Sequence, residues 1–165
     1  MNKTYYSQCI KFHQFWKLKV VKRRIFPSRS DKMELEKALK KRINFYSQFI
    51  SSNDLCFDVG ANIGNRVEPL LSLNAKVVAV EPQEKCCEIL RRKFGNKISL
   101  EAKGLGEKEE EKIFYISDIS VLSSFSEEWI DSVENSKRFG SYKWRKAQLM
   151  KITTLDILIK KYGVP

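Results

Sequence analysis

Short apolar runs alternate with helical patterns between residues 55 and 102, and this alternation constrains the fold more than any other feature. The three runs are LCFDV (55–59), KVVAVE (76–81) and ISLEA (98–102). They contain the apolar and β-branched residues that are typical of buried strands. Apolar residues recur at helical spacing over about 65–74 and again from Cys86 to Phe94. The order strand, helix, strand, helix, strand predicts an α/β fold with a parallel sheet and right-handed crossovers.

The first strand leads directly into a turn, DVGANIG, that contains Gly60 and Gly64. This turn lies at the carboxyl end of the strand, where open α/β sheets bind ligands. Glycine lets the backbone come close to a ligand, because a Cβ would collide with it. Glu81 ends the second strand, at the place where nucleotide-type sites use an acidic residue to accept both ribose hydroxyls. The two features together predict a nucleotide site, and tight turns without a ligand are the alternative.

A dinucleotide and S-adenosylmethionine are the two candidate occupants of this turn. The dinucleotide fingerprint G-x-G-x-x-G places a helix N-terminus against a pyrophosphate. Here Asn62 stands where the second glycine would be, and Asp58 precedes the turn. A carboxylate at that position would repel a pyrophosphate, but it suits a ligand that carries an ammonium group and a sulfonium. Charge therefore favours S-adenosylmethionine.

Five segments in this order resemble the FkbM-type methyltransferases. They are FDVGANIGN, VVAVEPQ, GLGEKEEEKIFYIS, SVLSSFSEEWI and KITTLDILIKKYGVP, and they fall within residues 45–165. The resemblance implies the class I methyltransferase fold, a Rossmann-like parallel sheet with flanking helices. It also implies S-adenosylmethionine as cofactor and O-methylation of a hydroxyl on a sugar or small metabolite, so the expected partner is a small-molecule or glycan acceptor.

The resemblance assigns cofactor-binding residues within two of these motifs. The residues of the turn that would cradle the amino-acid half of the cofactor are Asp58, Gly60, Ala61, Asn62 and Gly64. Glu81 would hold the ribose, and Pro82 would border the adenine, whose edge residues 102–104 would reach. Ser123 and Ser124 match a serine-rich family segment near the pocket, although a plain loop explains them equally well.

The resemblance also predicts that the domain is incomplete at its C-terminal end. In the family, a segment like TTLDILIKKYG leads into a further central strand with an acidic, glycine-containing motif. The sequence ends at Pro165, where that strand would begin, so the strand at 55–59 is expected at an open edge. We expect a truncated form of a longer enzyme, poorly soluble or self-associating by itself; a short protein that pairs with another chain is the alternative.

Charge divides the chain into two parts. Residues 1–50 contain 13 Lys and Arg against 3 Asp and Glu, whereas the remaining residues contain 18 against 17. We therefore distinguish a basic N-terminal arm and helix, residues 1–50, from an S-adenosylmethionine-binding domain, residues 51–165. Asp31 and Glu34 resemble a capping box that would begin a helix over about 32–50, packed on the domain after it. The acidic run EKEEEK, 107–112, is expected to form a solvated turn.

The stretch KFHQFWKLKVVKRR, residues 11–24, mixes basic and aromatic residues. It suits a solvated arm, or a peripheral contact with an anionic lipid surface, nucleic acid or an acidic substrate. Two other functions therefore stay open: a non-catalytic cofactor-binding fragment, and a methyltransferase that binds nucleic acid through this arm. The resemblance to small-molecule enzymes disfavours nucleic acid. Salt-dependent binding would discriminate between these possibilities.

Composition argues against several other classes of site. The four cysteines, Cys9, Cys56, Cys86 and Cys87, show no CxxC spacing, and His13 is the single histidine, so we expect neither a disulfide framework nor a metal site. The adjacent pair is better explained by packing than by redox chemistry. No apolar run approaches about 18 residues and no secretory signal is evident, which makes the cytoplasm the expected location. No residue stands out as a catalytic base, and none is assigned.

Overall fold

The computed structural model describes residues 28–136 and 142–165, in two compact units. The first unit ends at Arg42, and the second comprises Ile43–Pro165. The basic stretch 11–24, with His13, lies outside the described residues. Its proposed contacts with anionic surfaces therefore stay predictions.

The helix α2 (Arg29–Tyr46) is capped by Ser28. The Ser28 hydroxyl accepts the Asp31 N–H at 3.1 Å, and the Asp31 carboxylate accepts the Ser28 N–H at 3.0 Å. This reciprocal pair is a capping box, so the box predicted between Asp31 and Glu34 is wrong, and the helix begins earlier than residue 32. It also ends at Tyr46 rather than near residue 50, and none of its residues is buried. Tyr46 and Ile50 pack as partly buried residues against the core of the second unit.

The second unit contains the predicted parallel sheet. Its strands are β1 (Leu55–Val59), β2 (Lys76–Val80) and β3 (Ile98–Glu101), in the order β1-β2-β3. Phe57 pairs with Val78, and Val78 pairs with Ser99. The connecting helices are α3 (Val67–Ser72) and α4 (Glu84–Phe94), followed by the short helix η1 (Gly95–Lys97). The α/β class, the parallel pairing and the flanking helices are thus confirmed.

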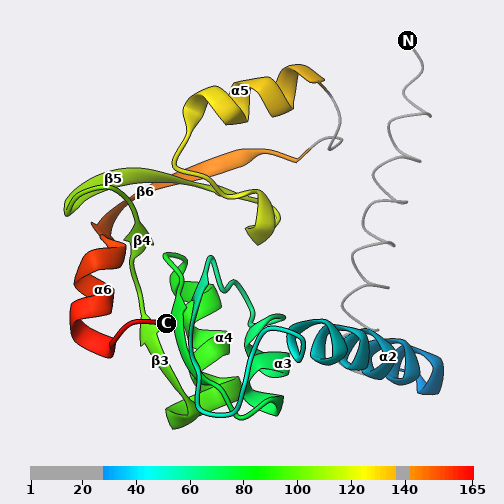
Figure 1. Cartoon of the computed structure of the whole chain (residues 1–165). Helices are drawn as coiled ribbons and strands as arrows, with labels where there is room; N and C mark the ends of the chain where they lie inside the picture. Colours follow the sequence, from blue (N-terminus) through cyan, green and yellow to red (C-terminus); the bar gives the residue numbers. More distant parts are fainter. Residues whose placement is uncertain (1–27, 137–141) are drawn as a thin grey trace, which may run out of the picture. The chain divides into compact units, whose positions relative to one another are not determined.

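Helices cover both faces of this sheet (Figure 1). Leu70 of α3 and Leu90 of α4 share a buried cluster with Val77 and Ala79 of β2. On the opposite face, Leu158 of α6 (Leu155–Tyr162) packs against Val78 and Val80. Successive residues of β2 therefore contact opposite layers, as the alternation of side chains along a strand requires. A strand buried on both faces must be continuously apolar, which explains the run KVVAV.

A second sheet follows the first and was not predicted. It consists of β4 (Gly104–Leu105), β5 (Glu110–Ser117) and β6 (Trp144–Thr153), in the order β4-β6-β5. β6 pairs with β4 in parallel and with β5 antiparallel. Between β5 and β6 lie the short helix η2 (Ser120–Leu122) and α5 (Glu127–Ser136). Trp129 of α5 contacts Trp144 of β6, with ring centroids 6.1 Å apart.

The acidic run 107–112 is only partly the expected turn. Residues 107–109 form the bend, but Glu110, Glu111 and Lys112 already belong to β5. Glu111 stands opposite Lys151 across the β5–β6 pair, so charged residues are tolerated where this sheet faces solvent. The expectation of a turn over the whole run is therefore wrong.

Within the described residues, β1 pairs only with β2 and is an edge strand of the parallel sheet, as predicted. Asp54 and Gly60, which flank this strand, are both hydrogen-bonded to β2. Lys76 N–H donates to the Asp54 carbonyl oxygen at 2.8 Å, and Gly60 N–H donates to the Val80 carbonyl oxygen at 2.9 Å. In a parallel pair, alternate residues of each strand bond to the same neighbour. The backbone groups of Leu55 and Phe57 consequently point away from β2.

Candidate functional site

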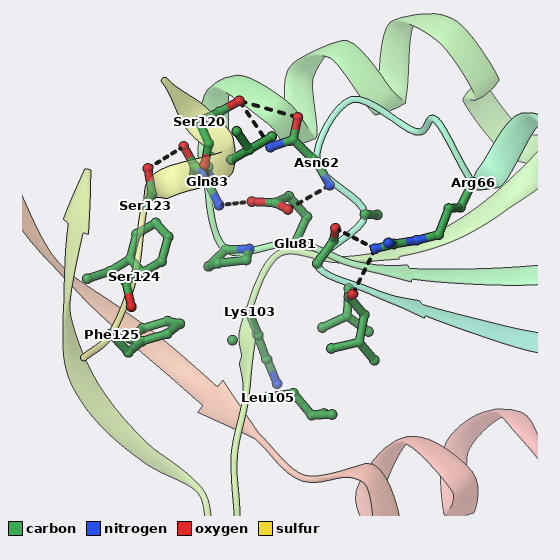
Figure 2. Close-up of a pocket in the computed structure, with 18 of the residues that line it drawn as sticks. Asn62, Arg66, Glu81, Gln83, Lys103, Leu105, Ser120, Ser123, Ser124 and Phe125 are labelled. Carbon is green, nitrogen blue, oxygen red and sulfur yellow. Dashed lines mark hydrogen bonds between the residues drawn. The ribbon is translucent and has the colours of Figure 1, made fainter. Parts of the chain in front are cut away.

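A pocket of about 570 Å³ opens at the carboxyl ends of β1 and β2 (Figure 2). Its size is within the range of small-molecule sites. The first sheet and the segments that follow its strands contribute Gly60, Ala61, Asn62, Arg66, Glu81, Pro82 and Gln83. The second sheet and the residues around it contribute Lys103, Leu105, Phe114, Ser123, Ser124 and Phe125. The pocket is therefore built from both sheets of the second unit.

Five of the seven predicted cofactor-binding residues line this pocket: Gly60, Ala61, Asn62, Glu81 and Pro82. The structure brings together the turn after β1 and the acidic residue after β2. Asp58 and Gly64 do not line the pocket, although both lie within two residues of positions that do. Ser123 and Ser124 also line it, so the serine-rich segment lies at the pocket.

The turn after β1 uses left-handed backbone conformations. Gly60 has φ +71°, and nothing lies within 4 Å of the position that a Cβ would occupy there. Gly64 has φ +83°, and a Cβ there would lie 2.3 Å from Cε2 of Phe94 on α4. Gly60 thus leaves open space beside the pocket, whereas Gly64 allows the turn to pack closely against α4. The close approach that Gly64 permits is internal to the fold.

Glu81 follows β2 and is only 2% exposed. Its Oε2 accepts the N–H of Asn62 at 2.8 Å, and its Oε1 accepts the N–H of Gln83 at 2.9 Å. Burial raises the pKa of this carboxyl, while the two backbone hydrogen bonds partly oppose that shift. Each carboxylate oxygen can accept a second hydrogen bond. Glu81 is therefore a fixed acceptor with capacity left for two donors from a ligand.

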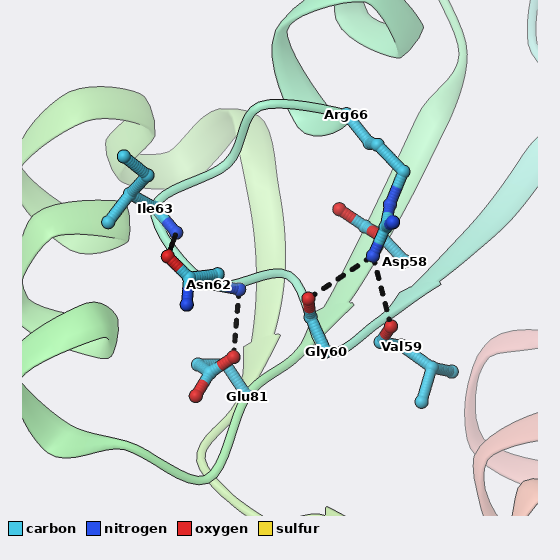
Figure 3. Close-up of polar contacts among 7 residues, drawn as sticks. All are labelled: Asp58, Val59, Gly60, Asn62, Ile63, Arg66 and Glu81. Carbon is cyan, nitrogen blue, oxygen red and sulfur yellow. Dashed lines mark hydrogen bonds and ion pairs between the residues drawn. The ribbon is translucent and has the colours of Figure 1, made fainter. Parts of the chain in front are cut away.

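Asp58, at the end of β1, is paired with Arg66, which sequence reasoning did not identify (Figure 3). Arg66 Nε donates to Asp58 Oδ1 at 2.7 Å, and Arg66 Nη2 donates to the carbonyl oxygens of Val59 and Gly60 at 3.3 and 3.2 Å. The hydrogen bond to Asp58 raises the pKa of Arg66. The only available signal was an arginine just before α3, eight residues after Asp58. Because Arg66 neutralises Asp58, the predicted repulsion of a pyrophosphate is weaker than expected.

Polar side chains connect the two walls of the pocket (Figure 2). Asn62 Nδ2 donates to Ser120 Oγ at 3.0 Å, and Gln83 Nε2 donates to the Ser120 carbonyl oxygen at 2.9 Å. Ser123 Oγ donates to Gln83 Oε1 at 3.3 Å. The short helix η2 is thereby fixed to the turn after β1 and to the residue that precedes α4. These contacts could not be predicted, because they join residues far apart in the sequence.

Other classes of site can be assessed for the described ranges only. In residues 28–136 and 142–165, no group of three or more His, Cys, Asp or Glu side chains is arranged to hold a metal ion. Among the helices described, none has the length and apolar character needed to cross a membrane. The charged residues of the pocket lining are Arg66, Glu81 and Lys103.

Comparisons of the chain with models of known protein families, with curated proteins and with solved structures found no match.

Proposed function

We propose that this chain binds S-adenosylmethionine and has the fold of a class I methyltransferase domain. The observation that carries the proposal is the position of Gly60 and Glu81 on one pocket, after adjacent parallel strands. An open turn and a fixed, buried carboxylate at these two places are the features that a nucleoside with free ribose hydroxyls requires. Among nucleoside ligands, the sequence resemblance to FkbM-type methyltransferases favours S-adenosylmethionine.

The described residues fit the cofactor in several respects. Glu81 has acceptor capacity for two ribose hydroxyls, and Gly60 leaves space for the chain that extends from the ribose. Pro82 lines the pocket beside Glu81, where it would border the adenine. Asp58 lies beside the turn, and its carboxylate would pair with the amino-acid half of the cofactor in place of Arg66. When bound, the cofactor would supply an electrophilic methyl group.

The reaction that we propose is O-methylation of a hydroxyl on a sugar or small metabolite. Much of the rate in such a transfer comes from holding the two reactants in line, which is a task for the walls of a pocket. A hydroxyl acceptor also needs a base to take its proton. Glu81 would be engaged with the ribose and Lys103 is a cation, so neither is assigned as base. A cofactor-binding protein without turnover is therefore the second candidate, and release of S-adenosylhomocysteine in the presence of hydroxylated acceptors distinguishes the two.

Calorimetric titration with S-adenosylhomocysteine and S-adenosylmethionine tests the binding proposal. Glu81→Ala is expected to weaken binding by about 2–3 kcal/mol, as for lost hydrogen bonds to a charged acceptor. Glu84→Ala is the matched control, because Glu84 is exposed, pairs with Arg91 on α4 and does not line the pocket. Equal affinity in the wild type and Glu81→Ala would refute the ribose assignment. Tighter binding of NAD than of either ligand would refute the class of cofactor.

A further inference from the structure

A set of acceptors at the edge of the pocket already binds a cation. These acceptors are the carboxylate of Asp58 and the carbonyl oxygens of Val59 and Gly60. Their present partner is the Arg66 guanidinium, which bonds to all three at 2.7 to 3.3 Å (Figure 3). Arg66 lines the pocket and Asp58 does not, so the cation lies on the pocket side of the carboxylate.

The two partners differ in how firmly they are held. The Asp58 side chain is 3% exposed and fixed at the end of β1, whereas the Arg66 side chain is 51% exposed. Arg66 uses only Nε toward the carboxylate, so the pair is not the two-bonded fork that makes arginine–carboxylate contacts strong. The Arg66 side chain can therefore move into solvent, whereas the Asp58 carboxylate stays buried and then needs another cation as its partner.

Asp58 is also incompletely satisfied. Its Oδ2 is buried, and it has no hydrogen-bond partner among the described residues. A buried carboxylate oxygen without a donor is costly, and native structures seldom leave one so. An ammonium group has three N–H donors and the same charge as the guanidinium. It could replace Arg66 and keep the carboxylate paired.

We propose that Arg66, when no ligand is bound, occupies the subsite of the ligand's α-ammonium. This subsite, formed by Asp58 and the carbonyls of Val59 and Gly60, lies in the turn that the resemblance already assigns to the amino-acid half of the cofactor. This inference rests on the proposed function for the identity of the ligand. Arg66 then acts as an internal competitor: a ligand with an ammonium group must displace it, and a ligand without one need not. The apparent affinity is then the intrinsic affinity multiplied by the fraction of molecules whose subsite is free.

Titration of Arg66→Met with two nucleosides tests the competition. S-adenosylhomocysteine carries the ammonium group, and 5′-methylthioadenosine lacks the whole amino-acid part. Arg66→Met is expected to bind S-adenosylhomocysteine roughly 3- to 10-fold more tightly than the wild type, with 5′-methylthioadenosine unchanged. Arg66→Lys retains a competing cation and is expected to stay near the wild type. Arg91→Met, which removes an exposed arginine on α4, is the control.

Weaker binding of S-adenosylhomocysteine to Arg66→Met, with 5′-methylthioadenosine unchanged, would mean that Arg66 contacts the ligand carboxylate, and it would overturn the proposal. Equal changes for both nucleosides, or none, would also overturn it.

A second measurement does not depend on the identity of the nucleoside. Arg66→Ala removes the guanidinium, so added guanidinium chloride at low millimolar concentration is expected to raise the thermal midpoint of this variant relative to sodium chloride, with no rise in the wild type. If neither nucleoside binds any variant, the proposed function fails and this rescue alone decides the subsite. Absence of rescue would then overturn it.

Discussion

The two sheets of the second unit differ in which of their residues are buried. In the parallel sheet, four of the five residues of β2 are buried, because helices cover both faces. In the second sheet, most residues of β5 and β6 are at least partly exposed, and Ile113 and Leu149 stand opposite each other while half exposed. The parallel sheet is held by continuous apolar contact, and the second sheet mainly by backbone pairing and one packed face.

This difference extends to the pocket. The parallel sheet contributes backbone turns and the buried carboxylate of Glu81, and the buried carboxylate of Asp58 holds Arg66 at the pocket. The second sheet contributes hydroxyl and aromatic side chains, such as Ser123 and Phe125, from segments next to exposed strands. In the proposed methyltransferase, the first wall would position the nucleoside and the second wall would face the acceptor.

The largest expected effect compares two leucines. Leu90 is fully buried between α4 and the parallel sheet, whereas Leu149 is 58% exposed on β6. Leu90→Ala is expected to lower the free energy of unfolding by about 3 kcal/mol, through lost burial and a residual cavity. Leu149→Ala is expected to change it by less than about 0.5 kcal/mol. Urea unfolding followed by circular dichroism measures both, and similar values would abolish the contrast between the sheets.

A pair of glycines gives the next largest effect. Gly64 combines φ +83° with a would-be Cβ 2.3 Å from Phe94, so Gly64→Ala adds backbone strain to overpacking. We expect it to cost roughly 2–3 kcal/mol. Gly104, on β4, has an ordinary φ, and its nearest neighbours are the side-chain ends of Ile152 and Phe125. Gly104→Ala is expected to cost about 1–2 kcal/mol, and a larger loss than for Gly64→Ala would contradict the strain argument.

The same contrast explains how much of the fold could be predicted from the sequence. The strands at 55–59, 76–80 and 98–101 were predictable, because each of them is a legible apolar run between helical patterns. The strands EEKIFYIS and WRKAQLMKIT were not predictable, because polar residues interrupt each apolar pattern. The two strands also pair with each other although residues 118–143 separate them in the sequence. Their assignment needs tertiary information that no local pattern contains.

The site divides in the same way. Gly60 and Glu81 could be placed from the sequence, because their positions at strand ends follow from the order of elements. Arg66 could not, because its bond to Asp58 depends on the left-handed conformations of Gly60 and Asn62 that fold the turn back. Ser120 could not either, because it reaches the pocket only through the second sheet.

A third prediction concerns pH and the buried carboxylate of Glu81. Burial raises its pKa above the ordinary value of 4.5, so the unfolded state loses its proton at lower pH than the folded state does. The contribution of this group to stability is thus fully present below pH 4.5 and is lost as pH rises through the raised pKa. In Glu81→Gln this loss is absent. The difference in thermal midpoint, wild type minus variant, is expected to fall as pH rises from 4 to about 7.

The control for that measurement is Glu110→Gln on the second sheet. Hydrogen bonding from Lys112 and the nearby Lys108 charge lower the pKa of Glu110, so its contribution has the opposite sign and is lost as pH falls. The two differences should therefore change in opposite directions over the same pH range. If the difference between the wild type and Glu81→Gln instead rises with increasing pH, the two backbone hydrogen bonds to the Glu81 carboxylate outweigh the effect of its burial on the pKa.

The smallest effect concerns thiol reactivity and leaves stability almost unchanged. Cys87 is fully buried beside the parallel sheet, donates its thiol to the Glu81 carbonyl oxygen, and has its pKa raised by burial to about 12. Only the thiolate reacts, so about one Cys87 in ten thousand would be reactive at pH 8 even with free access. In a Cys9→Ser background, we expect iodoacetamide to leave Cys86 and Cys87 unmodified, while a cysteine introduced by Leu149→Cys on exposed β6 reacts at the rate of a free peptide. Peptide mapping by mass spectrometry measures all three sites. Rapid labelling of Cys87 in the folded protein would mean that the region around Glu81 opens as readily as the second sheet. The proposed difference in rigidity between the two walls of the pocket would then be wrong.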